Sequence, residues 1–281
     1  MTYQECYEKG VGTLVEAEVP EASLDARLLL EYVCGTNRNT LLVHNDREVT
    51  VDEQNRYEEI VRLRARRIPL QQLTGMQEFM GLRFAVNEHV LVPRQDTEIL
   101  VEEVLRNLHD GMRVLDMCTG SGCIILSLLH YSNDCEGVGV DISAEALAVA
   151  AENARRLCEG ATLTLTESDL FEHVEGRFDV IVSNPPYIRH EEIAGLMPEV
   201  REHEPLQALD GGEDGLFFYR KIIEESRTFL VSGGLLYFEI GFDQAAAVAD
   251  LMEQSGFADI QVVKDYAGLD RVVYGTWIVR S

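Results

Sequence analysis

The chain has 281 residues, of which 46% are hydrophobic and 26% charged, the composition of an ordinary folded protein with room for two domains. It carries 49 acidic and 24 basic residues, which gives a formal charge of −25. Proteins bind nucleic acid by neutralising its phosphates with Lys and Arg. This balance therefore argues against broad nucleic-acid binding and favours a protein or small-molecule substrate.

Neither export nor a bound metal is indicated. The longest apolar runs have the length of buried strands and are too short to span a membrane, and the N-terminus lacks the basic-then-apolar order of a secretion signal. The six cysteines include no Cys-x-x-Cys pair and the seven histidines are scattered, so no zinc site is expected. We expect a cytoplasmic protein with reduced thiols and no membrane association.

Residues 1–70 are predicted to form a helical domain. One helix begins near Ser23 and ends at Gly35, a residue suited to the C-cap. A second begins at Thr50, which forms a capping-box pattern with Glu53, and ends before Pro69. Its last turns carry Arg62, Arg64, Arg66 and Arg67. Because the helix dipole favours cations at a C-terminus, we prefer that explanation of the arginines to a partner-docking patch.

Residues 71–93 are predicted to be a β-hairpin linker, with its turn at Asn87. From residue 94 to 281, apolar strands alternate with helices, for example those over 144–157 and 244–254. This alternation is typical of an α/β domain with a mostly parallel sheet covered on both faces. The expected strands lie at residues 113–117, 137–142, 163–167, 179–183, 235–240, 260–263 and 271–279.

The first strand of this domain leads into a turn of small residues and then a helix. The turn consists of Cys118, Thr119, Gly120, Ser121 and Gly122. Glycines allow a ligand to approach the backbone closely, and a helix N-terminus offers unpaired N–H groups. Dinucleotide-binding proteins share the pattern, and a tight turn without a ligand also fits it.

Two carboxylates follow the next two strands. Asp141 is placed to accept hydrogen bonds from both ribose hydroxyls of a nucleoside. It could instead cap the following helix, although Ser143 fits that role better. Up to this point a nicotinamide dinucleotide and S-adenosylmethionine fit equally well. Asp169 favours S-adenosylmethionine, because methyltransferases place a carboxylate at this position to receive the adenine amino group.

The loop Asn184-Pro185-Pro186-Tyr187 follows a buried strand, at the sheet edge where ligands bind in such folds. The prolines stiffen it and remove N–H donors, so the Asn184 side-chain oxygen and the Pro185 carbonyl can accept both hydrogens of an –NH2 group, with Tyr187 against its flat face. Holding these hydrogens aims the nitrogen lone pair at a methyl donor. The loop therefore predicts methylation of a planar nitrogen, and a simple proline-rich turn is the weaker alternative.

Over nearly its whole length the chain resembles the release factor glutamine methyltransferases. The resemblance rests on blocks of residues in family order and spacing. They lie at residues 69–75, 79–84, 90–98, 116–122, 141, 184–187, 204–220, 239–241 and 264–271. The chain departs from the family at Cys118, where glycine is usual, and at Leu170, where many members carry an aromatic residue.

The resemblance implies a class I S-adenosylmethionine-dependent methyltransferase domain, Rossmann-like with a seven-stranded sheet, behind a small helical domain that recognises the substrate. The implied reaction methylates the side-chain amide nitrogen of the glutamine in the Gly-Gly-Gln motif of class 1 peptide chain release factors. By the same match, residues 118–122, Asp141, Leu170 and Asn184 line the cofactor, and residues 184–187 hold the glutamine.

Three other functions fit part of this pattern. Methylation of an adenine amino group in DNA or RNA shares the loop chemistry, but the acidic balance and the lack of a basic target-recognition region argue against it. Methylation of a ribosomal-protein glutamine is a sister activity, against which Gly211-Gly212 and Tyr219-Arg220 favour release factors. A binding module without chemistry is disfavoured by the intact loop at 184–187.

Overall fold

The computed structural model describes residues 1–279, and the chain forms two compact units. The first unit contains Met1–Met76 together with Met197–His203, and the second contains Gln77–Leu196 and the chain from Glu204 onwards. A segment distant in sequence thus belongs to the N-terminal unit. Within the described residues, no helix is both long and apolar enough to cross a membrane.

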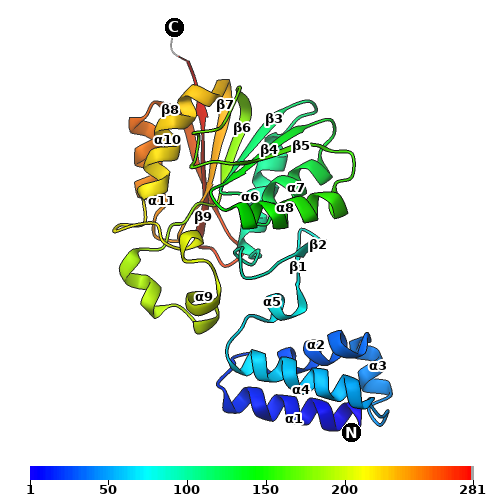
Figure 1. The fold of residues 1–281 in the computed structure, drawn as a ribbon. Helices are drawn as coiled ribbons and strands as arrows, with labels where there is room; N and C mark the ends of the chain where they lie inside the picture. The colour runs from blue at the N-terminus through cyan, green and yellow to red at the C-terminus, as the bar shows by residue number, and fades with distance from the viewer. Residues whose placement is uncertain (280–281) are drawn as a thin grey trace. The chain divides into compact units, whose positions relative to one another are not determined.

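The N-terminal unit is built from helices (Figure 1). They are α1 (Tyr3–Glu16), α2 (Ala22–Cys34), α3 (Arg38–Val43), α4 (Val51–Ala65), α5 (Leu70–Thr74) and α9 (Pro198–His203). The capping box at Thr50 and Glu53 is confirmed, as is the left-handed C-cap at Gly35. The buried Tyr57 hydroxyl donates to the Ala26 carbonyl at 3.0 Å, which ties α4 to α2 inside the apolar core.

Two of the four clustered arginines are internal. Arg64, 5% exposed, donates to Asp25 at 2.7 Å and to Glu199 at 2.8 Å. Arg67 donates to both oxygens of Glu199, at 2.7 and 2.6 Å. Arg62 pairs with Glu59 on the surface of the same helix. The dipole explanation is therefore incomplete, because Arg64 and Arg67 hold α9 in the N-terminal unit.

The second unit begins with the hairpin of β1 (Met76–Phe79) and β2 (Leu82–Ala85). The expected turn at Asn87 is wrong, because the chain reverses at Met80 and Gly81, both with positive φ (50° and 70°). Two consecutive left-handed residues are what a tight two-residue hairpin turn requires. Methionine is an unusual choice for the first of them, which hid the turn in the sequence.

The seven-stranded sheet has the order β5-β4-β3-β6-β7-β9-β8, with β9 antiparallel to both neighbours and the other pairings parallel (Figure 1). This confirms the predicted fold class. The strands are β3 (Arg113–Met117), β4 (Glu136–Asp141), β5 (Thr162–Glu167), β6 (Phe178–Ser183), β7 (Leu230–Glu239), β8 (Phe257–Lys264) and β9 (Asp270–Trp277).

Helices cover both faces of this sheet, because the strand side chains alternate between two apolar cores. Val114 and Val180 join the core beneath α6, α7 and α8, whereas their neighbours Leu115 and Ile181 join the core beneath α10 and α11. The helices are α6 (Asp96–Asn107), α7 (Cys123–Tyr131), α8 (Ala144–Leu157), α10 (Phe217–Phe229) and α11 (Ala245–Gln254), with 3-10 turns at His190–Gly195 and Leu206–Ala208.

Candidate active site

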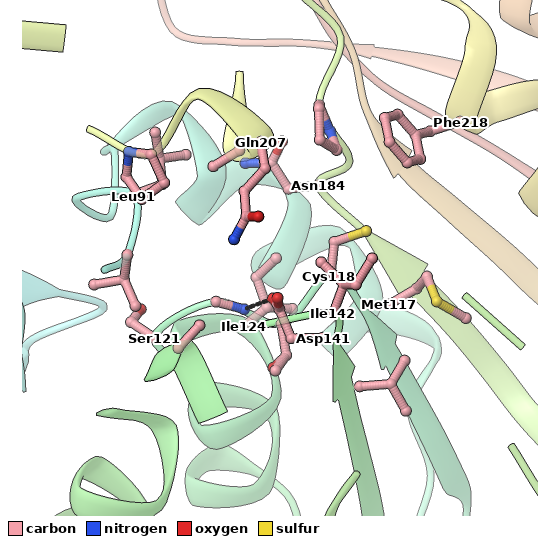
Figure 2. Close-up of a pocket in the computed structure, with 18 of the residues that line it drawn as sticks. Leu91, Met117, Cys118, Ser121, Ile124, Asp141, Ile142, Asn184, Gln207 and Phe218 are labelled. Atoms are coloured by element: carbon pink, nitrogen blue, oxygen red, sulfur yellow. Dashed lines mark hydrogen bonds between the residues drawn. The ribbon is translucent and has the colours of Figure 1, made fainter. Parts of the chain in front are cut away.

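A pocket of about 490 Å³ opens at the carboxyl ends of the central strands (Figure 2). In the sheet, Met117 at the end of β3 is paired with Val140 of β4 on one side and with Ser183 of β6 on the other. The segments that follow these three strands therefore start side by side. This is the point where the strand order reverses, and such a crevice is the usual ligand site of an open α/β sheet.

The turn after β3 is held from below by a buried carboxylate. Asp116 accepts hydrogen bonds from the Thr119 hydroxyl at 2.6 Å and from the Ile125 amide at 3.3 Å. Burial raises the pKa of Asp116 to about 7, although these two hydrogen bonds lower it. The Thr119 amide also donates to the Val140 carbonyl at 2.9 Å. The turn is thus fixed against β4 before any ligand arrives.

Cys118 adopts the left-handed conformation, with φ of 63°. Left-handed backbone costs an L-residue roughly 1–2 kcal/mol, a cost that glycine does not have. Burial raises the pKa of the Cys118 thiol, so the side chain is a neutral thiol rather than a reactive thiolate. The turn accommodates the Cβ of Cys118 in this left-handed conformation, with local strain as the consequence.

We expect Cys118→Gly to be more stable than Cys118→Ala by about 1 kcal/mol, because both remove the thiol and only glycine relieves the backbone. Urea unfolding of the two variants measures the difference in their free energies of unfolding, provided that both show the same dependence of that free energy on urea concentration. An alanine variant as stable as the glycine variant would show that the backbone at residue 118 is unstrained.

Asp141 lies at the end of β4, and both of its carboxylate oxygens accept hydrogen bonds from backbone amides beside the pocket. The Gly120 amide donates to one oxygen at 2.8 Å and the Ser143 amide to the other at 3.0 Å. Burial raises the pKa of Asp141, and these amides oppose the shift. Ser143, and not Asp141, is the N-cap of α8, because the Ser143 hydroxyl accepts a hydrogen bond from the Ala146 amide at 3.1 Å. Each Asp141 oxygen keeps lone-pair capacity for a ligand hydroxyl.

Asn184 leaves β6 with its side chain directed by α6. Its amide nitrogen donates to the Thr97 hydroxyl at 3.4 Å, so the amide oxygen remains available to the pocket. In Figure 2, Asn184 and Gln207 lie on the side of the pocket opposite Asp141 and Ser121. A ligand between the two sides would therefore have the Asp141 carboxylate near one end and the Asn184 amide oxygen near the other.

The rest of the loop is braced from behind. The Tyr187 hydroxyl donates to Glu239 at 3.4 Å, and its carbonyl accepts from the Gln244 side chain at 3.0 Å. A Cβ at Gly211 would come within 2.7 Å of the Tyr187 Cα, and one at Gly215 within 2.5 Å of its carbonyl oxygen. The glycine block at 211–215 thus lets a second loop pack directly on the Tyr187 backbone.

Most residues expected at the site line this one pocket. They are Cys118, Thr119, Gly120, Ser121, Asp141, Asp169, Leu170, Asn184 and Pro186. Three do not line it, namely Gly122, Pro185 and Tyr187, and the Tyr187 ring packs against the core on the α10 side of the sheet. Thr97, Gln207, Glu239 and Gln244 lie in no sequence pattern that predicts a role for them at the site. Within residues 1–279, no His, Cys, Asp and Glu side chains are grouped so as to hold a metal ion.

Comparison with known families gives two matches. Residues 5–75 match the PrmC N-terminal domain, and residues 94–199 match the methyltransferase small domain. Among solved structures, a methyltransferase from Pyrococcus furiosus is 19% identical with a TM-score of 0.54, covering 72% of this chain and 91% of that one. At that identity the likeness concerns the fold alone.

Closer relatives carry one shared name. A release factor glutamine methyltransferase of Geobacter sulfurreducens is 44% identical, covering 94% of this chain and 93% of its own length. One from Clostridium acetobutylicum is 42% identical, covering 89% of each. With both family domains matched and such relatives aligned over nearly their whole length, the chain belongs to the release factor glutamine methyltransferase family.

Proposed function

We propose that this protein methylates the side-chain amide nitrogen of the glutamine in the Gly-Gly-Gln motif of class 1 peptide chain release factors, with S-adenosylmethionine as methyl donor. The observation that carries the proposal is the Asn184 amide. Its nitrogen is bound to Thr97 at 3.4 Å, which leaves its oxygen for a donor in the pocket. A primary amide is such a donor, and it can satisfy two acceptors at once.

The pocket residues fit the adenosyl part of this cofactor. Asp141, already held by two backbone amides, would accept from the ribose hydroxyls, and the exposed carboxylate of Asp169 would accept from the adenine amino group. The buried Leu170 offers an apolar contact to a flat base. When bound, S-adenosylmethionine would supply a methyl group on a positively charged sulfur, and the sulfur would be the leaving group when a nitrogen takes the methyl group.

Asn184 and Pro185 would act on the substrate amide nitrogen. An amide lone pair is delocalised into its carbonyl, so the nitrogen is a weak nucleophile. Asn184, which lines the pocket, would accept one N–H hydrogen; Pro185 does not line the pocket, so its carbonyl would accept the second only from a substrate amide that reaches past Asn184. Accepting both hydrogens would return electron density to nitrogen and fix its direction of approach. The nitrogen that receives the methyl group would be strongly acidic, and it would lose one of the two protons held by these acceptors to water.

The proposal is tested by methyl transfer from labelled S-adenosylmethionine to a recombinant class 1 release factor. The matched control is the same factor with its Gly-Gly-Gln glutamine replaced by asparagine, which keeps the amide but shortens its reach. We expect label in the first and none in the second. Label in ribosomal protein or DNA, and none in release factor, would replace the proposal by one of the other methyltransferase functions.

We further propose that the N-terminal unit recognises the release factor and that the reaction takes place in the cytoplasm. The short helix α3 buries none of its residues, and its Leu42 and Val43 are 66% and 72% exposed. Exposed apolar side chains gathered on one element often mark a protein contact. Replacing both by serine should raise KM for intact release factor and leave KM for a short Gly-Gly-Gln peptide unchanged. An equal effect on both substrates would contradict this role.

A further inference from the structure

A line of polar groups begins at Asn184 and Thr97, which both line the pocket, and continues to Glu239, which does not. The Asn184 amide nitrogen donates to the Thr97 hydroxyl at 3.4 Å, and the Thr97 hydroxyl is near enough to Glu239 to lower the pKa of that carboxyl. Glu239 also accepts from the Tyr187 hydroxyl at 3.4 Å. The line therefore joins both ends of the Asn184–Tyr187 loop to one carboxylate on β7.

Glu239 is a costly residue at this position. It is 2% exposed, and one of its carboxylate oxygens has no hydrogen-bond partner among the described residues. Buried carboxylates are destabilising unless they are fully paired, and replacing them by apolar residues often stabilises a protein. A carboxylate placed here without full pairing is better explained by what it does to its neighbours than by a contribution to folding.

We propose that Thr97 and Glu239 are positioning residues that determine which way the Asn184 side-chain amide faces. This inference rests on the function proposed above. A hydroxyl has one proton, so if Thr97 donates it to Glu239, its oxygen must accept from Asn184. That contact binds the amide nitrogen and turns the amide oxygen toward the substrate. In the reversed orientation an N–H group would face the substrate N–H, and the acceptor would be lost.

Several charged and titratable groups surround Glu239. Arg271 on β9 attracts its charge while itself pairing with Asp265 at 3.0 Å and Asp96 at 3.2 Å. Asp96 on α6 repels the charge of Glu239, and Tyr187 in the loop, Tyr219 on α10 and Cys123 on α7 also face this carboxyl. Burial raises the pKa of Glu239 to about 7 even though Thr97, Arg271 and Tyr187 lower it.

The direct test compares Thr97→Val with Thr97→Ser. Valine has nearly the same shape without the hydroxyl, whereas serine keeps it. We expect Thr97→Val to lower kcat about 10–100-fold, the usual effect of losing a group that orients a site residue, with cofactor Kd unchanged, and Thr97→Ser to restore most of the rate. Equal losses in both variants, or a normal kcat in Thr97→Val, would overturn the proposal.

A second test uses Glu239→Gln and pH. Above a pH of about 7 Glu239 is ionised and can only accept, which fixes the direction of the line; below it, the protonated acid can donate to Thr97 and release Asn184. Wild-type kcat should therefore rise with pH through about 7. Glutamine can donate at every pH, so Glu239→Gln should be slow with this rise absent. Burial also raises the pKa of Asp116 to about 7, so a rise in the wild-type profile could come from either carboxyl. The Glu239→Gln variant separates them, because it removes only the titration of Glu239.

If Glu239→Gln keeps the wild-type pH profile, the positioning role is wrong. That result is distinct from failure of the proposed function, in which the wild-type protein would transfer no methyl group to release factor at any pH.

Discussion

Asn184→Ala is expected to lower turnover on release factor by about 10²–10³-fold, which corresponds to about 2.7–4 kcal/mol in the barrier. The reason is that the Asn184 oxygen acts on the substrate amide nitrogen in the transition state. The cofactor is held mainly by Asp141 and the turn at 118–122, so its affinity should change little. Single-turnover rates and calorimetric binding of S-adenosylmethionine separate the two effects.

Asn133→Ala is a suitable control, because Asn133 is exposed in the loop that precedes β4, whereas the pocket opens at the other, carboxyl end of that strand. Its turnover should match that of the unsubstituted protein. A variant at Asn184 with unchanged turnover would remove the proposed role of the loop. Equal losses of cofactor affinity and rate would mean that Asn184 serves cofactor binding instead.

Glu199→Ala is expected to destabilise the N-terminal unit by about 3–5 kcal/mol, because it leaves two arginines without their shared carboxylate. Arg64 is 5% exposed and would lose a partner at 2.8 Å, while Arg67 would lose both of its contacts to this side chain. Trp277 lies on β9 in the other unit, so tryptophan fluorescence does not report this change. Amide hydrogen exchange in α2 and α4 does.

Glu202→Ala is the matched control, since Glu202 is on the same short helix but is exposed, and its ion pair is with the neighbouring Arg201. Protection of α2 and α4 should be lost in Glu199→Ala and kept in Glu202→Ala. Unchanged protection in both would mean that α9 is not held by the arginines. Deleting the residues before 70 would strip Glu199 of its partners, so surface substitutions test substrate recognition more cleanly than truncation.

The Glu199 contribution should also depend on pH in one direction. Burial opposes ionisation of this carboxyl, but the Arg67 and Arg64 contacts outweigh it and lower the pKa of Glu199 to about 2, from an ordinary 4.5. A lowered folded-state pKa means stability that is complete above about 4.5 and is lost as the pH falls toward 2. The stability gap between wild type and Glu199→Ala should therefore narrow on acidification.

The fold was largely predictable because its information is local. Helix α8 and strand β3 have the expected bounds, since each combines a strong periodic pattern with a clear cap or turn. Strand β7 begins five residues before the expected Leu235, because Gly233-Gly234 resembles a turn although it lies within the strand. The pairing of Arg64 with Glu199 joins residues far apart in sequence, and no local pattern indicates it.

The candidate site likewise has a part that the sequence predicts and a part that only the folded structure shows. Cys118, Asp141 and Asn184 each follow a strand end, and the carboxyl ends of parallel strands must meet, so their convergence follows from topology. Thr97 and Glu239 meet behind the loop only because α6 and β7 pack on either side of it. Their residue types are common in helices and strands, and only the folded arrangement shows what they contact.

The most direct test of the central claim is the position of the transferred methyl group. After reaction with S-adenosylmethionine, the release factor is digested and the Gly-Gly-Gln peptide is sequenced by tandem mass spectrometry. We predict one methyl group, carried by the glutamine side-chain nitrogen, and the same product formed about 10²–10³-fold more slowly when Asn184→Ala replaces the wild-type protein. A methyl group on another residue, or an unmodified Gly-Gly-Gln peptide after prolonged reaction with active wild-type protein, would contradict the account.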